Sequence, residues 1–154
     1  MEASEVMREV LKDRKYYEQS LGGVTFSGGE PTFQFEFLLE LLRLSKDNHL
    51  HVCLETNGMI NSEKLGQLMD DVDLFLFDYK ATGDALHQKL TGVSNQPILE
   101  NLRLLAENNC SVILRCPIVQ GINDREEHFE AIKGLCKQYE NIIAAEIMPY
   151  HHTG

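Results

Sequence analysis

The sequence predicts an α/β fold in which about five parallel strands form one sheet or a partial barrel. Three observations support this prediction. Short runs of strand-forming residues recur along the chain, runs with apolar residues at helical spacing separate them, and each unit spans about 25 to 30 residues. Strands that alternate with helices in this way are joined by right-handed crossovers, which make neighbouring strands parallel.

Runs of strand-forming residues predict strands at residues 24–27, 51–55, 73–80, 111–118 and 142–148. The third run is almost continuously apolar, as is typical of a strand whose two faces are both covered. We expect helices over residues 4–19, 33–46 and 97–108, one that Ser62 caps, and one capped by Asn123 or Asp124 that ends at Tyr139. Residues 81–95 are expected to form a loop. With no linker in the sequence, residues 1–154 are expected to form a single domain.

Composition excludes several classes of function. The chain has 24 acidic and 14 basic residues and a formal charge of -10, which would repel nucleic acid and anionic membranes. No apolar stretch approaches the length of a membrane span, and the first residues lack signal-peptide features, so we expect a cytoplasmic protein. The cysteines show no close metal-ligand spacing and are expected to be buried thiols; they are Cys53, Cys110, Cys116 and Cys136.

Polar residues lie at or near the end of every predicted strand, and in parallel α/β folds the ends of the strands form the binding edge. They are Ser27 to Glu30, Glu55 to Asn57, Asp78 with Lys80, Arg115, and His151. An edge with both charge signs suits a zwitterionic, amino-acid-like cofactor. The alternatives stay open for each residue: Glu30 complements a helix dipole, Asp78 and Lys80 form a solvated pair, and His151 belongs to a tail.

Taken together, these motifs resemble the radical S-adenosylmethionine (SAM) enzymes, and among them the activating enzymes of glycyl radical enzymes such as pyruvate formate-lyase. The resemblance covers nearly the whole chain. It rests on GGVTFSGGEP, CLETNG, LFLFDYK, HQKLTGVSN, ILRCPIVQGIND and IMPYHHTG, which begin at residues 22, 53, 74, 87, 113 and 147. The implied fold is the radical SAM type of partial (β/α) barrel, with its first strand missing from this chain.

The resemblance also implies a set of SAM-binding residues. The amino group of SAM would be held by Gly28, Gly29 and Glu30. Its polar end would lie near Lys80, Arg115 and His151, and its adenine would lie between Pro117 and Met148. Glu55 and Asp78 match acidic positions that help to hold a monovalent cation, although many relatives have Asp where this chain has Glu55.

In the resembled family a [4Fe–4S] cluster reduces SAM, and the resulting 5′-deoxyadenosyl radical takes a hydrogen from a glycine of the partner enzyme. The cluster is held by three cysteines in a CxxxCxxC motif, which this chain lacks. We therefore expect a fragment of a radical SAM oxidoreductase, inactive in isolation, in which residues 4–19 match the helix after the missing strand. Its exposed sheet edge would favour a dimer.

The expected partners are a glycyl radical enzyme and a reductant such as flavodoxin or ferredoxin. Two other hypotheses remain. The chain could be a cluster-free relative that binds SAM or docks on a partner without radical chemistry. It could also be an unrelated α/β domain that binds an anionic metabolite at the turn of Gly28 and Gly29.

Overall fold

Five parallel strands form one sheet in the order of the chain, in a computed structural model that describes residues 2–150. The strands are β1 (Gly23–Phe26), β2 (His51–Thr56), β3 (Leu74–Asp78), β4 (Val112–Ile118) and β5 (Ile142–Pro149). Every neighbouring pair is parallel. The sequence prediction of five parallel strands and a partial barrel is confirmed, and each strand lies within a few residues of its expected position.

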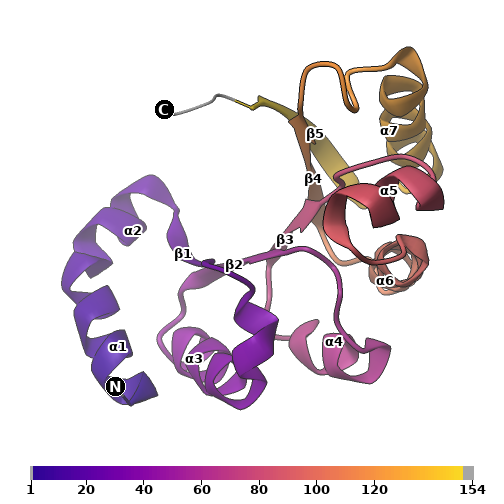
Figure 1. The fold of residues 1–154 in the computed structure, drawn as a ribbon. Coiled ribbons are helices and arrows are strands. Elements are labelled where there is room, and N and C mark those ends of the chain that lie inside the picture. The colour runs from indigo at the N-terminus through magenta and orange to yellow at the C-terminus, as the bar shows by residue number, and fades with distance from the viewer. Residues whose placement is uncertain (1, 151–154) are drawn as a thin grey trace.

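The helices that connect the strands lie on one face of the curved sheet, and the opposite face is open between α2 and β5 (Figure 1). Sequential strand order explains this, because right-handed crossovers that all step in one direction place every helix on the same side. The helices are α1 (Ala3–Val10), α2 (Arg14–Ser20), α3 (Phe35–Asp47), α4 (Ser62–Leu68), α5 (Asp84–Thr91), α6 (Gln96–Glu107) and α7 (Glu126–Gln138). Two 3₁₀ helices, η1 (Leu11–Asp13) and η2 (Pro31–Gln34), complete the described elements.

The core lies between the sheet and these helices. Alternate residues of the three central strands are buried there, and they include Val52, Leu54, Phe75, Phe77, Val112 and Leu114. On the open face, Leu74 and Leu76 of β3 are only partly buried. The prediction that both faces of β3 are covered is therefore wrong for the described residues. The apolar run reflects burial on one face and partial shelter by sheet curvature on the other.

Four further differences from prediction concern the helices and their caps. The helix expected over residues 4–19 is interrupted by η1. The helix after β2 is capped by Asn61 and not by Ser62, because Asn61 Oδ1 accepts hydrogen bonds from the main-chain N–H groups of residues 63 and 64. Neither Asn123 nor Asp124 caps α7, since its N-cap is Arg125. The Asn123 amide instead donates to two main-chain carbonyls, those of residues 80 and 117, which ties the ends of β3 and β4 together.

The fourth difference is α5, which lies within the loop expected at residues 81–95. Its ends are joined by Asp84, whose carboxylate accepts hydrogen bonds from Ser94 Oγ at 2.6 Å and from the Asn95 N–H at 2.9 Å. Buried His87 bonds to the carbonyl of Val93. These contacts between side chains and loop stabilise a helix that is too short to show a clear apolar period.

Candidate cofactor-binding site

The turn after β1 is held by Glu30, which caps η2 and also contacts the end of β2. Glu30 Oε1 accepts hydrogen bonds from the N–H and hydroxyl of Thr32 and, at 2.9 Å, from Thr56 Oγ1. Its Oε2 accepts the N–H of Asn57 at 2.8 Å. Gly28, with φ of 135°, is in a conformation that side chains rarely adopt. Glu30 therefore performs the structural role of a helix cap, while Oε2 keeps capacity for one further donor.

Arg115 forms the centre of a charged group on the open face. Its Nη1 lies 2.5 Å from Glu55 Oε1, and Ser27 Oγ donates to the other oxygen of Glu55 at 3.0 Å. Glu146 Oε2 lies 3.7 Å from Arg115 Nε, and Arg115 Nη2 lies 3.1 Å from Met148 Sδ. The Nε atom is buried without a hydrogen-bond partner among the described residues. β1, β2, β4 and β5 thus all contribute to one polar group.

Asp78 and Lys80 form a second charged group at the end of β3. Lys80 Nζ lies 2.8 Å from Asp78 Oδ2, and both side chains are partly exposed. They line an open pocket of about 540 Å³ between η2, α5 and α6, together with apolar residues such as Met59, Leu90 and Ile98. The register places Asp78 beside Arg115, and Arg115 beside Glu146, so one row across the sheet contains a member of each charged group.

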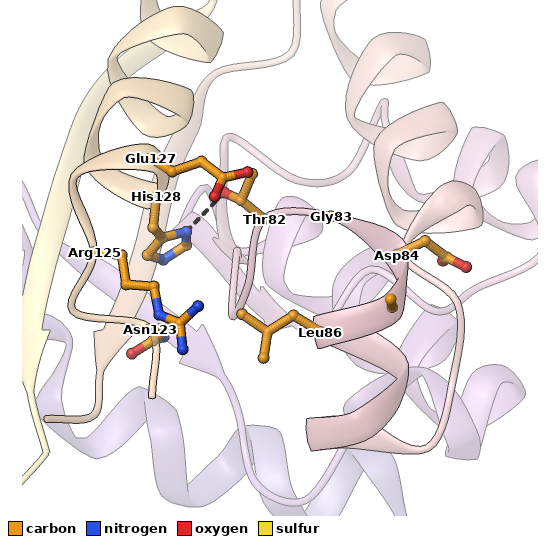
Figure 2. A pocket seen from close by; sticks show the side chains of 9 residues that line it. Thr82, Gly83, Asp84, Leu86, Asn123, Arg125, Glu127 and His128 are labelled. Atoms are coloured by element: carbon orange, nitrogen blue, oxygen red, sulfur yellow. Dashed lines mark hydrogen bonds between the residues drawn. The ribbon is translucent and has the colours of Figure 1, made fainter. Parts of the chain in front are cut away.

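A separate pocket of about 310 Å³ lies between the first turns of α5 and α7, and none of the predicted site residues lines it. Figure 2 shows Arg125 and His128 on one side of this pocket and the carboxylate of Asp84 directed away from it. His128 stacks on Tyr79 and bonds to Thr82 Oγ1 at 2.8 Å. Burial lowers the pKa of His128 below its ordinary value, so the ring is neutral near pH 7.

The structure brings most of the predicted residues to one edge of the sheet. Within residues 2–150 they form the Glu30 turn with Gly28 and Gly29, the Glu55–Arg115 group and the Asp78–Lys80 pair. Pro117 and Met148 are register partners at the ends of β4 and β5. His151 lies outside the described residues. Sequence reasoning missed Glu146, although its position two residues before Met148 places the two on the same face of β5.

The described residues do not fit an iron–sulfur cluster. No three His, Cys, Asp or Glu side chains among them are grouped as metal ligands. Clusters are held by thiolates, whereas burial raises the pKa of every cysteine and that of Cys116 to about 12. Glu55 and Asp78, predicted to hold a monovalent cation, are each paired with a basic side chain.

The fold and this edge define an α/β half-barrel that places charged side chains of both signs where parallel strands end. Residues 1–132 match the model of the Radical SAM superfamily. A crystal structure of a domain of pyruvate-formate lyase-activating enzyme from Bacteroides vulgatus aligns with a TM-score of 0.78 and 30% identity, covering 85% of this chain and 82% of that one. The chain therefore belongs to the radical SAM superfamily, whose members use SAM and a [4Fe–4S] cluster.

Its relatives within the superfamily are activating enzymes of glycyl radical enzymes. The choline trimethylamine-lyase activating enzyme of Oleidesulfovibrio alaskensis is 37% identical over 98% of this chain and 50% of its own length. The pyruvate formate-lyase 1-activating enzyme of Escherichia coli K12 is 35% identical over 97% of this chain and 62% of its own length. The chain thus spans half to two thirds of the curated relatives it matches. No helix within residues 2–150 is long and apolar enough to cross a membrane.

Proposed function

We propose that this chain is the SAM-binding portion of an activating enzyme that generates a glycyl radical on a partner enzyme. The observation that carries the proposal is the gathering of charged residues from β2, β3, β4 and β5 on one open face, next to Met148. Both charge signs are present there, as a ligand with an ammonium, a carboxylate and a sulfonium group requires. The similarity to activating enzymes supports the reaction class.

In this proposal each group of the site binds one part of SAM. Arg115 and Lys80 bind its carboxylate, because they are the basic side chains of the two charged groups at this edge. The Gly28–Glu30 turn binds its ammonium through the free capacity of Glu30 Oε2. Pro117 and Met148 contact its adenine. SAM supplies the radical chemistry of hydrogen removal when a cluster is also bound, and this chain supplies binding and orientation.

Binding of S-adenosylhomocysteine (SAH) to the purified chain tests the cofactor assignment. Arg115→Met should weaken binding about tenfold or more, since it removes a charge-assisted hydrogen bond. Arg103→Met is the matched control, because Arg103 is exposed on α6 and, within residues 2–150, forms its ion pair with Glu107 of the same helix. Isothermal titration calorimetry measures both. Equal affinity of the wild type and Arg115→Met would contradict this site, and tight phosphate binding instead would favour an anion-binding domain.

The partner and the radical reaction need a second experiment. We propose a glycyl radical enzyme of the pyruvate formate-lyase type as the partner, with flavodoxin or ferredoxin as the reductant. The longer protein that carries a CxxxCxxC motif, reconstituted anaerobically, should produce a glycyl radical signal on its partner in electron paramagnetic resonance. Absence of such a motif from the coding DNA before residue 1 would favour the cluster-free alternative. Size-exclusion chromatography would test the expected dimer.

A further inference from the structure

We propose that Glu146 determines specificity at this site by favouring a positively charged sulfonium over a neutral thioether. This inference rests on the proposed function, because it concerns the same ligand. Glu146 lies on β5 in the row that also contains Asp78 and Arg115. Its side chain is 52% exposed, so its carboxylate is accessible from the open face.

The charges of the open face do not balance, and Glu146 carries the excess. Glu55 pairs with Arg115 at 2.5 Å, and Asp78 pairs with Lys80 at 2.8 Å. Glu146 is left 3.7 Å from Arg115 Nε, which is too far for a hydrogen bond to that atom. Within these two charged groups, as the structure describes them, two cations therefore face three carboxylates, which is a net charge of -1; Glu30 lies outside the two groups, where it is held by Thr32, Thr56 and Asn57.

The carboxylate of Glu146 lies on the part of the face where the sulfur of the proposed ligand would bind. Met148, two residues further along β5, is on the same face as Glu146 and contacts Arg115 Nη2 at 3.1 Å. In the proposed binding mode the carboxylate is at Arg115 and the adenine at Met148, so the sulfur between them lies on the face of β5 that Glu146 shares with Met148. A sulfonium there is attracted by the unbalanced carboxylate, whereas a thioether is not.

The size of the effect follows from Coulomb attraction at a hydrated surface. Unit charges about 7 Å apart attract enough to change an affinity about threefold in bulk water, and by more where water is partly excluded. The attraction should weaken as salt is added, since exposed charges are screened. Loss of the Glu146 charge should therefore reduce preference for cationic ligands without an equal loss of affinity for the neutral ligand.

Calorimetric titration of the chain with SAM, SAH and sinefungin tests this. Sinefungin carries an ammonium group in place of the sulfonium. Glu146→Gln should lower the ratio of SAM affinity to SAH affinity at least about threefold relative to the wild type, with sinefungin following SAM. The matched control is Glu140→Gln, which removes the same charge from an exposed residue before the amino end of β5. It should leave the ratio unchanged.

Each outcome bears on a definite claim. Equal weakening of all three ligands by Glu146→Gln would overturn the inference, because it would show that Glu146 only holds Arg115 in place. An unchanged ratio would also overturn it. If the wild-type chain bound none of the three ligands, the proposed function itself would fail and the specificity role with it. Nε chemical shifts of Arg115 in the two variants would show separately whether its position has changed.

Discussion

The turn that follows β2 depends on the absence of a side chain at residue 58. Gly58 has φ of 76°, in the left-handed region, and a Cβ atom built on it would lie 2.4 Å from Cζ of Phe77. Phe77 is fully buried in the core, so its ring has no free space into which to move. The same turn presents the N–H of Asn57 to Glu30. Gly58→Ala therefore perturbs both the core and the candidate site.

Two costs add in Gly58→Ala. The left-handed conformation costs an L-residue about 1 kcal/mol relative to glycine. The clash with Phe77 overpacks the core, which costs about 1–3 kcal/mol. We expect the free energy of unfolding to fall by about 2–4 kcal/mol, a large fraction of the total stability of a domain. Urea unfolding followed by circular dichroism measures this loss.

Two other glycines separate these costs. Gly92 has φ of 83° with open space around it, so Gly92→Ala should lose only about 1 kcal/mol. Gly66 lies inside α4 with nothing near its Cβ position, and Gly66→Ala should gain about 0.5–1 kcal/mol. If Gly58→Ala were no more destabilising than Gly92→Ala, Phe77 would not pack against this turn and the reasoning would be refuted.

Three further predictions concern buried polar and thiol groups. Asn101→Ala should destabilise by about 2 kcal/mol in urea unfolding, since Asn101 Nδ2 donates to the carbonyls of Gly58 and Ile60. Burial lowers the pKa of His128 below 6.5, so the unfolded state binds the proton more readily and the free energy of unfolding should fall from neutral pH to about pH 5. His128→Gln should make this fall shallower in urea unfolding at several pH values. An unchanged dependence of stability on pH in this variant would contradict the prediction. Cys116, with its pKa raised to about 12 by burial, should resist iodoacetamide until denaturant is added, as mass spectrometry would show.

The strands could be predicted from sequence because each is a local run of strand-forming residues, and sequential crossovers then fix their order and direction. The gathering of Glu55, Asp78 and Arg115 followed from this topology, since each lies at or near the carboxyl end of its strand. The contacts made by these residues could not be predicted in the same way. That Glu55 reaches across β3 to Arg115 depends on sheet curvature and side-chain length, which no local pattern encodes.

Long-range and loop contacts explain the remaining failures. The carboxylate of Glu30 is held by Thr56 and Asn57, which are more than 25 residues away in the chain, so its structural role was visible only as an alternative. Helix α5 was missed because contacts of Asp84 and His87 with the following loop stabilise it, and these are not periodic. Glu146 is not among the predicted binding residues, and only the alternation of side chains along β5 places it on the same face as Met148.

The open face carries both apolar and charged side chains, and the register shows how they are placed. Cys53 and Leu74 share a row nearer the amino ends of the strands, and Leu76 and Ile113 share the next row with Glu55; all five are partly buried. The following row contains Asp78, Arg115 and Glu146, and Arg115 has a buried Nε without a hydrogen-bond partner among the described residues. Burying charge costs free energy unless it is paired, and here Arg115 pairs with Glu55 and Asp78 pairs with Lys80. Paired charges of both signs toward the carboxyl ends of the strands support the proposed ligand site at that edge.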